Sequence, residues 1–393
     1  MSERPLDGIV VAEFGNLIAA PYASMLLADL GARVIKVETT KGDLGRQFGP
    51  FQDGESVFYM SVNRGKESLS VDPGDWVAKR VFDNLVRRCD VLIHNLRHGA
   101  MERMGLGADR AVELNPTLIY ASVSAFGAEG PYAERAGIDV VFQGESGMIS
   151  ISGHAKDGPR KTATTIGDYV AGTNAALAIS AALVERPRRA RRIDVSLRDG
   201  LMAVQSGWNA LAFNSGSQPE RTGTASPYLA PNQVFEGSDR PFTLAVVSDR
   251  HFEILCRELK RPDLLESYPT NDQRMADRDS LARKLARVFK TESAGHWVNL
   301  LGAAGLPVGR VLSIEESFAD PQAQHNGMSV VFEHRAAGTV RVTGSPIHVD
   351  REPALAERPP ATLGQDTRSL LHELGVDDNT VEELIASGRA VAS

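Results

Sequence analysis

The amino-acid sequence predicts an α/β protein with a large domain built on a mostly parallel sheet and a smaller mixed α/β domain. At 393 residues and 42% apolar side chains, the chain is too long for one ordinary core and apolar enough for two. Residues 1–125 alternate strand-like and helix-like segments, which is typical of a parallel sheet covered by helices. After residue 213 glycine and proline become frequent, and a second set of strand-like and helix-like segments follows.

The N-terminal part carries the pattern of the predicted sheet. Short runs of apolar and β-branched residues predict strands, and apolar residues at helical spacing predict helices between them. The strands are expected at 8–14, 32–38, 67–72, 90–95 and 118–124, and the helices at 21–31 and 76–89. The first strand is followed by GNLIAAPYASM, which contains neither G-x-G-x-x-G nor a Walker lysine. Ordinary dinucleotide binding and P-loop chemistry therefore lose support.

The rest of the chain predicts a long helix, a smaller mixed domain and a helical C-terminus. Apolar periodicity places helices at 167–185, 250–259 and 278–290, and strands at 242–247 and 338–350. The last segment predicts two helices separated by Gly375, the second capped by Asp377 or Asp378.

Charge and composition exclude several classes of partner. The formal net charge is −7, which argues against general attraction to nucleic acid or to an anionic membrane surface. The basic run at 186–192 has no interleaved aromatic residues and is interpreted as a solvated connection. No apolar stretch reaches the roughly 20 residues of a membrane span, and the N-terminus does not resemble a signal peptide. We expect a cytoplasmic protein in which Cys89 and Cys256 are buried thiols.

Two common kinds of catalytic site find no support in the sequence. The nine histidines are scattered, His94 and His98 form the only close pair, and no metalloprotease pattern accompanies them. No G-x-S-x-G motif is present. We therefore expect neither a metal site nor a serine hydrolase triad.

Asp168 is the only charged residue between 164 and 183, at the start of the long predicted helix. An aspartate in this place is most often a helix N-cap. The same place suits a nucleophile, because free N–H groups and the helix dipole would keep the carboxylate ionised and could stabilise an oxyanion. The small residues Ala171, Gly172 and Ala175 would let a slender ligand or another backbone approach. Local pattern alone leaves both interpretations open.

A series of motifs runs along the whole chain in a specific order. They are AAPYASMLLADLGARVIKVE (19–38), GDLGR (42–46), NRGKESLSVD (63–72), DVLIHNLRHGAMERMGLG (90–107), NPTLIYASVSAFGAEGPY (115–132), DVVFQGESGMISISG (139–153) and GDYVAGTNAALAISAAL (167–183). This ordered set resembles the class III (CaiB/BaiF-type) coenzyme A transferases, which include formyl-CoA and carnitine-CoA transferases and the related 2-methylacyl-CoA racemases. The resemblance implies an enzyme that moves coenzyme A from an acyl-CoA to a carboxylic acid, with succinyl-CoA as the candidate donor.

The resemblance also implies which residues act. Asp168 would be the nucleophile, passing through an acyl-aspartyl anhydride and an aspartyl-CoA thioester. Coenzyme A would be a substrate, with no tightly bound cofactor. Asp139 and Tyr228 are candidates for the substrate pocket. The family pattern places coenzyme A contacts on Leu17, Ile18, Val71, Asn95, Leu96 and Arg103, the last for a phosphate. Lys36, Arg46, Arg64 and Lys66 are further candidates for a basic patch.

One departure from the family pattern separates transferase from racemase. Racemases of this fold carry histidine before aspartate, whereas this chain has Ile138 before Asp139. One of two proton carriers is therefore missing, and racemase activity becomes the second hypothesis. A third hypothesis is a non-catalytic acyl-CoA binding protein, which retention of Asp168 in its GDYVAG setting disfavours. A nicotinamide oxidoreductase lacks its glycine fingerprint.

The resemblance finally implies the architecture of the assembly. The large domain would be Rossmann-like, comprising 1–205 and completed by 330–393, with the small domain and its connectors at 206–329. Two chains would form an interlocked homodimer, each passing through a ring made by the other. Sequence pattern alone does not reveal such threading.

Overall fold

A computed structural model describes residues 4–185, 187–216 and 218–393. The chain divides into two compact units. Unit 1 contains residues 4–148, 162–210 and 321–393, and unit 2 contains 149–161 and 211–320, among the described residues. Compared with the expected boundaries, residues 149–161 group with the smaller unit, and residues 206–210 and 321–329 group with the larger one. Each unit is described by itself below.

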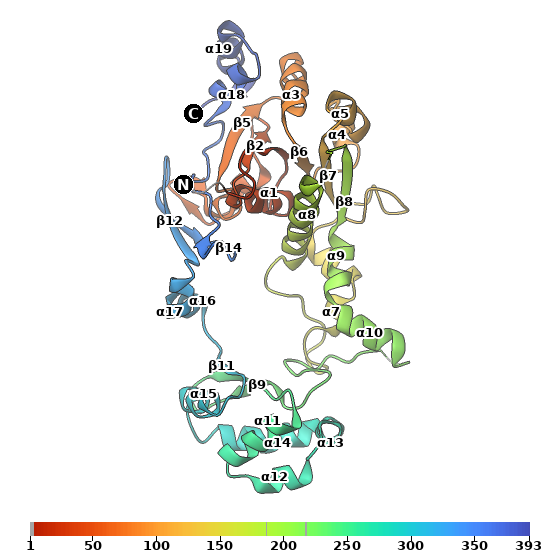
Figure 1. The fold of residues 1–393 in the computed structure, drawn as a ribbon, viewed down its shortest axis with the longest axis vertical. Helices are drawn as coiled ribbons and strands as arrows, with labels where there is room; N and C mark the ends of the chain where they lie inside the picture. Colours follow the sequence, from red (N-terminus) through yellow and green to blue (C-terminus); the bar gives the residue numbers. More distant parts are fainter. Residues whose placement is uncertain (1–3, 186, 217) are drawn as a thin grey trace. The chain divides into compact units, whose positions relative to one another are not determined.

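Unit 1 is organised around a seven-stranded sheet with strand order β16-β5-β2-β1-β6-β7-β8 (Figure 1). Six strands of this sheet run parallel to one another, in the order β5-β2-β1-β6-β7-β8. Strand β16 runs antiparallel beside β5. Without β16 the order is that of a Rossmann fold, 3-2-1-4-5-6. The mostly parallel sheet predicted from the alternating segments is therefore confirmed. Its strands are β1 (Val10–Phe14), β2 (Arg33–Glu38), β5 (Lys66–Val71), β6 (Val91–His94), β7 (Ile119–Ser124), β8 (Arg191–Ser196) and β16 (Ala390–Val391).

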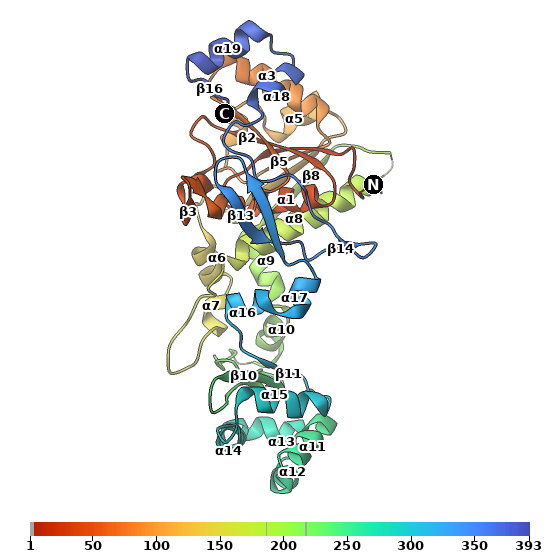
Figure 2. The ribbon, with the colours of Figure 1, turned by 90° about the vertical axis from the view of Figure 1, so that its left-hand side faces the viewer.

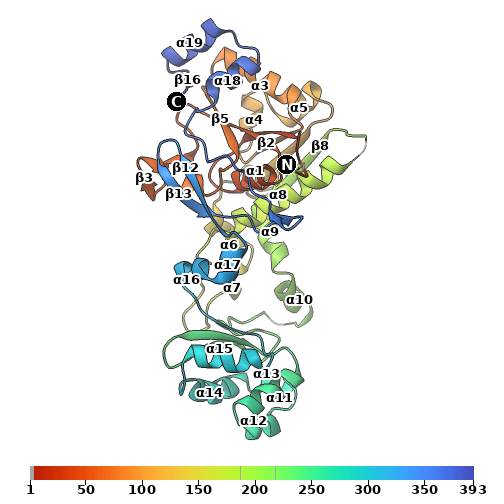
Figure 3. The ribbon, with the colours of Figure 1, turned by 60° about the vertical axis from the view of Figure 1, so that its left-hand side comes forward.

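Helices cover both faces of this sheet, which buries its apolar strands on two sides. One face packs against α1 (Ala19–Asp29), α8 (Ile166–Val184) and α9 (Leu197–Val204). The other packs against α3 (Trp76–Arg88), α5 (Ala108–Leu114) and the C-terminal helices α18 (Thr367–Glu373) and α19 (Asp378–Ala386), as Figure 3 shows. The predicted N-cap of the last helix is confirmed, because the Asp377 carboxylate accepts a hydrogen bond from the Thr380 amide.

Helices α1 and α8 approach each other closely through small side chains. A Cβ atom at Gly172 would lie 2.7 Å from the Ala19 carbonyl oxygen and 3.1 Å from the Tyr22 ring. Ala171 and Ala175 are fully buried in the same contact layer. The small residues after Asp168 therefore let the backbone of helix α1 approach, which confirms one of the two expected alternatives; at Gly172 that backbone occupies the space that a ligand would need.

The C-terminal segment completes the far edge of the sheet. The Asp366 carboxylate accepts a hydrogen bond from the Ser68 amide at 2.8 Å, and Ser68 Oγ accepts one from the Gly364 amide at 2.8 Å. The Thr367 hydroxyl accepts one from the Ser70 amide at 2.9 Å. Strand β16 then pairs with β5. Residues about 300 positions apart in the sequence thus build one edge.

Unit 1 also contains short hairpins and helices outside the main sheet. The hairpin of β12 (Ser329–His334) and β13 (Gly338–Thr343) is drawn in blue in Figure 2, where β13 is labelled. Its apolar side chains pack on Tyr59 and Met60. The other short elements are η1 (Leu44–Gln47), β3 (Phe51–Gln52), β4 (Glu55–Ser56), α2 (Val57–Met60), α4 (Ala100–Arg103), α6 (Asp139–Glu145), α17 (Pro321–His325), β14 (His348–Val349) and β15 (Glu352–Pro353). Helices α7 (Met148–Ile151) and α10 (Ser206–Asn214) cross the division between the units.

Unit 2 is a small α/β structure with its own core. An antiparallel sheet in the order β11-β10-β9 packs against helices through a cluster of aromatic rings that includes Phe235, Phe242, Phe289 and Trp297. Its elements are β9 (Asn232–Glu236), β10 (Pro241–Ala245), α11 (Asp249–Glu258), α12 (Pro262–Ser267), α13 (Asn271–Ala276), α14 (Arg278–Phe289), α15 (Ala294–Ala303), β11 (Val308–Arg310) and α16 (Ile314–Ala319).

Three expectations from the sequence concern the cysteines, the basic run and membrane-spanning helices. Cys89 and Cys256 are buried free thiols, as expected. The arginines of the basic run that the structure describes, residues 188–192, form ion pairs with acidic partners such as Asp90 and Glu185. In the described part of the chain, no helix combines the length and apolar character needed to cross a membrane.

The close packing at Gly172 predicts that Gly172→Ala destabilises the protein by about 1–3 kcal/mol, because its Cβ would overlap the α1 backbone. Gly144→Ala is the matched control, since Gly144 is a helical glycine of the same unit with open space around its Cβ position. The control should be neutral or stabilising by up to about 1 kcal/mol. Urea denaturation followed by circular dichroism measures both; equal stability of the two variants would contradict the packing argument.

Candidate active site

The sheet has a topological switch point at β1. Strand β2 pairs with one edge of β1 and β6 with the other. The chain passes from β1 to β2 on one side, and after β5 it crosses back to β6 on the other side. Open α/β sheets bind ligands in the crevice outside the carboxyl ends of strands at this point. The structure therefore directs attention to the loops that follow β1, β2, β5 and β6.

A small cavity lies among these loops. Val71 and Leu96, two of the residues expected to contact coenzyme A, line it. The fold thus brings together candidates from the ends of two different strands. The lining residues are Phe14, Gly15, Asn16, Val37, Glu38, Thr39, Gly42, Asp43, Val71, Pro73, Phe82, Leu96 and Met104.

Three other residues expected to contact coenzyme A lie in the loop after β1 or bind it. The Asn95 side chain accepts a hydrogen bond from the Asn16 amide and donates one to the Asn16 carbonyl, both at 2.8 Å. Leu17 has a positive φ of 65°. Ile18 is buried at the N-cap position of α1. Asn95 therefore shapes the loop, and its direct contact with coenzyme A stays a prediction, as do those of Leu17 and Ile18.

Arg103 lies at the end of the short helix α4, with an exposed side chain. It directly precedes Met104, which lines the cavity. This placement is compatible with a phosphate contact at the cavity rim, and that role stays a prediction.

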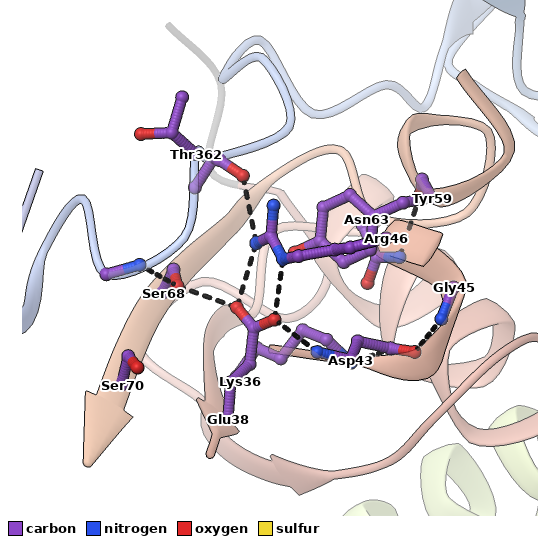
Figure 4. A network of polar contacts seen from close by, with 12 residues as sticks. Lys36, Glu38, Asp43, Gly45, Arg46, Tyr59, Asn63, Ser68, Ser70 and Thr362 are labelled. Atoms are coloured by element: carbon purple, nitrogen blue, oxygen red, sulfur yellow. Dashed lines mark hydrogen bonds and ion pairs between the residues drawn. The ribbon is translucent and has the colours of Figure 1, made fainter. Parts of the chain in front are cut away.

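The expected basic patch of Lys36, Arg46, Arg64 and Lys66 is wrong. All four side chains are buried or nearly so and are paired with acids. Figure 4 shows two of them, Lys36 and Arg46. Lys36 Nζ lies 2.6 Å from a Glu13 oxygen and 2.8 Å from an Asp43 oxygen, and Lys66 Nζ lies 2.8 Å from the other Glu13 oxygen. Arg46 is paired with Glu38 and Arg64 with Asp29. Buried cations need such acidic partners. None of these four basic side chains is therefore available to bind a phosphate.

The electrostatics of this cluster follow from its burial. Burial alone would raise the pKa of Glu13, yet Lys36 and Lys66 lower it to about 2. Burial lowers the pKa of Lys66 to about 8 although Glu13 opposes the shift. Asp43 and Glu13 outweigh burial at Lys36 and raise its pKa. Glu13 is therefore the central anion of the cluster, shared by two lysines.

Asp168 is the third residue of α8, where it lies in the first turn. The N-cap position is occupied by Thr165, without a side-chain capping bond. The local interpretation of Asp168 as the N-cap is therefore wrong. In the described part of the chain, no side chain or amide donates a hydrogen bond to its carboxylate, so the group is not tied to a structural task.

Asp139 performs the capping that was expected of Asp168. Its Oδ1 accepts a hydrogen bond from the Gly167 amide at 2.8 Å, and its Oδ2 accepts one from Gln143 Nε2 at 2.6 Å. Burial and, secondly, the negative charge of Asp139 raise the pKa of Asp168 to about 7. The expectation that the helix start favours the ionised form of Asp168 is therefore not met, because burial and, secondly, the charge of Asp139 raise its pKa.

Both helix starts lie at the carboxyl edge of the sheet. The Tyr22 and Tyr169 rings meet edge to face at 4.9 Å between centroids, and the Ala19 carbonyl lies against Gly172. The first turns of α1 and α8 are therefore neighbours. The nucleophile candidate and the cavity are thus built from the same end of the same sheet.

Two further residues of the sequence analysis are Ile138 and Tyr228. Ile138, at the position of the racemase histidine, is 66% exposed at the N-cap of α6. Tyr228 belongs to unit 2, where its carbonyl accepts a hydrogen bond from Asn271 Nδ2 at 2.9 Å. Its place in a substrate pocket stays a prediction.

The sequence reasoning missed Asp43 and Gln143. Gln143 is fully buried and also accepts a hydrogen bond from the Thr162 amide at 2.8 Å, which ties α6 to the loop before Asp168. Charged residues inside apolar strand runs, such as Glu13 and Lys36, were an available signal. A strand covered on both faces can bury such charges only as pairs. Among the described residues, no three His, Cys, Asp or Glu side chains form a group suited to a metal.

Comparisons with known proteins agree with this geometry. The family model for CoA-transferase family III matches residues 6–367. Succinyl-CoA:glutarate CoA-transferase of Homo sapiens is 33% identical over 98% of this chain and 90% of its own length. Acetyl-CoA:oxalate CoA-transferase of Acetobacter aceti is 34% identical over 91% of this chain and 92% of its own.

Solved structures extend the likeness to three dimensions. The crystal structure of a CaiB/BaiF family protein from Brucella suis superposes with a TM-score of 0.84 at 31% identity, covering 95% of this chain and all of that one. The family match covers most of the chain, and the relatives match it nearly end to end. The chain therefore belongs to CoA-transferase family III.

Proposed function

We propose that this enzyme transfers coenzyme A between carboxylic acids with Asp168 as its nucleophile. The observation that carries the proposal is a partly buried carboxylate without a hydrogen-bond donor in the described chain, on a helix that starts at the carboxyl edge of the sheet. The cavity at the switch point lies at the same edge and supplies a place for the coenzyme. Because the chain belongs to the transferase family, coenzyme A transfer is the reaction that would use both the Asp168 carboxylate and this cavity.

The chemistry requires a carboxylate that reacts in its ionised form. The Asp168 carboxylate attacks the thioester carbonyl of the donor, the C–S bond breaks, and an acyl-aspartyl anhydride and free CoA thiolate result. The thiolate then attacks the Asp168 carbonyl, which releases the donor acid and leaves an aspartyl-CoA thioester. The acceptor carboxylate repeats both steps in reverse, and Asp168 ends as a carboxylate. No proton is consumed, and no cofactor besides the coenzyme A substrate is needed.

The substrate class we propose is a dicarboxylic acid acceptor with succinyl-CoA as donor. Support comes from the names of the two relatives, which specify glutarate and oxalate as acids and succinyl-CoA and acetyl-CoA as thioesters. A panel of these thioesters and acids, with mass detection of the new thioester, tests the assignment directly.

Racemisation is the less favoured alternative. A racemase needs a proton carrier on each side of the α-carbon, and Ile138 has an exposed aliphatic side chain where one would stand. A non-catalytic acyl-CoA binding protein would have no use for a carboxylate whose pKa is raised to about 7. Deuterium exchange at the α-carbon of a 2-methylacyl-CoA distinguishes the racemase from the transferase, which should show none.

We expect the enzyme to work in the cytoplasm, which suits its thiols. Burial raises the pKa of Cys89 and of Cys256 to about 12, so both remain protonated at neutral pH. Neither is placed to form a disulfide in the described structure. A reducing compartment fits this arrangement.

Removing the nucleophile should abolish transfer without unfolding the protein. We expect Asp168→Ala to lower the rate of transfer from succinyl-CoA to glutarate by roughly 1,000-fold or more. Asp199→Asn is the matched control, because Asp199 is also the third residue of its helix, α9. After addition of donor and hydroxylamine, only chains that retain Asp168 should carry a hydroxamate at that residue. An active alanine variant would refute the assignment.

The raised pKa of Asp168 predicts the pH dependence of the reaction. The ionised form reacts, so kcat/KM should rise with pH through about 7. Asp139→Asn removes the negative charge beside Asp168, and the midpoint should move to lower pH while burial keeps it above 3.8. Asp199→Asn should leave the midpoint in place. A midpoint that Asp139→Asn leaves unchanged, or raises, would show that Asp139 does not act on Asp168.

The family resemblance also leads us to propose an interlocked homodimer. Helix α8 exposes Leu177 and Val184, which are 68% and 76% exposed in a single chain, and a partner chain would cover such apolar side chains. We expect a dimer that persists at nanomolar concentration in sedimentation velocity, since threaded chains cannot separate without unfolding. A monomer at that concentration would contradict the proposal.

A further inference from the structure

The turn between β1 and α1 contains an unusual backbone conformation. Leu17 has a φ of 65°, in the left-handed region that side chains other than glycine seldom adopt. Such conformations persist where surrounding contacts hold them, and they are frequent at ligand-binding positions. The contacts that hold this turn therefore bear on what it does.

Asp43 and Asn95 hold the turn from two sides. Asp43 Oδ1 accepts hydrogen bonds from the Leu17 amide at 2.9 Å and from the Gly45 amide at 2.7 Å. Asn95 binds both backbone groups of Asn16. The turn is thus attached to the loop after β2 and to the loop after β6.

Asp43 is in turn fixed by the buried charges below it. Its Oδ2 lies 2.8 Å from Lys36 Nζ. Lys36 Nζ also donates to the Gly15 carbonyl at 2.9 Å and is paired with Glu13. The side chains of Lys36, Glu13 and Asp43 are completely buried. Lys36 therefore orients Asp43 and holds the start of the same turn, and neither group can reorient without leaving a buried charge unpaired.

These contacts define one side of the cavity at the switch point. Gly15 and Asn16 line it from the turn, and Gly42 and Asp43 line it from the loop after β2. Asp43 bridges the two segments. If the bridge were lost, the turn could relax from its strained conformation and change the shape of the cavity.

We propose that Asp43 is a positioning residue of the coenzyme site, which acts by accepting the Leu17 amide and so holding the Gly15–Leu17 turn as a wall of the cavity. The inference rests on the proposed function, because it takes this cavity as the place where coenzyme A binds. Asp43 is assigned no part in the acyl transfer itself.

Two substitutions separate the hydrogen bond from the charge. Asp43→Asn and Asp43→Val both remove the negative charge next to Lys36, but only asparagine retains an oxygen that can accept the Leu17 and Gly45 amides. We expect Asp43→Val to raise KM for the acyl-CoA donor and the calorimetric Kd of free coenzyme A at least tenfold, with kcat changed less than about threefold. Asp43→Asn should recover most of the affinity.

Asp29→Asn is the control for a buried ion pair elsewhere in unit 1. Asp29 is fully buried, is paired with Arg64 at 2.6 Å and does not line the cavity. It should lower thermal stability and leave the Kd of coenzyme A unchanged. This result would separate positioning from a general loss of stability.

Each outcome of the experiment bears on the proposal. Unchanged affinity in Asp43→Val, or an equal loss in Asp29→Asn, overturns it. If Asp43→Val does not fold, a tenfold loss of affinity in Asp43→Asn overturns it, and near-normal affinity there supports it. If the unsubstituted enzyme transfers coenzyme A while the Asp43 variants bind it normally, only the positioning role fails. If the unsubstituted enzyme neither binds nor transfers coenzyme A, the proposed function fails first.

Discussion

The shared carboxylate of Glu13 is the interaction on which the coenzyme end of the fold depends. It lies on β1 and receives Lys36 from β2 and Lys66 from the first residue of β5, so it links three adjacent strands. Placing these charges in the interior requires complete pairing, because an isolated buried ion is strongly disfavoured. Lys36 extends the pairing to Asp43, which connects the sheet to the loops around the cavity. The shape of the site is therefore set by the same charges that join the strands.

Asp139 and Asp168 lie near the same helix start but have different roles. Two carboxylates lie near the start of α8, and one amide of that start is bound by Asp139. Asp139 is thereby committed to structure, and Asp168 is left partly buried without a donor in the described chain. Burial and the neighbouring charge make ionised Asp168 less stable than an exposed aspartate, which favours attack on an electrophile over a resting ion pair. Gln143 maintains this arrangement by holding Asp139 from the other side.

Local pattern was sufficient for the elements of the fold but not for the partners of charged groups. Strand β2 was expected at 32–38 and lies at Arg33–Glu38, and α3 was expected at 76–89 and lies at Trp76–Arg88, because apolar periodicity is a property of neighbouring residues. The cap of α8 comes from Asp139, 28 residues before the amide it accepts, and Lys36 is paired with Glu13 across two strands. Such pairs depend on which strands become neighbours. For this reason local pattern could not separate a cap from a nucleophile at Asp168, and the buried basic residues were wrongly expected to form a phosphate patch.

The C-terminal segment contacts the strands beside the site, although it is the last part of the chain to be synthesised. Arg46, beside the cavity, donates to the Ala361 carbonyl, and Ser68 on β5 binds both Gly364 and Asp366. The edge strand β16 ends at Val391. A nascent chain emerging from the ribosome therefore carries β1, β2 and β5 long before the residues that close their edge exist. The sheet therefore contains strands that are among the first to be synthesised, β1, β2 and β5, and an edge strand, β16, that is among the last.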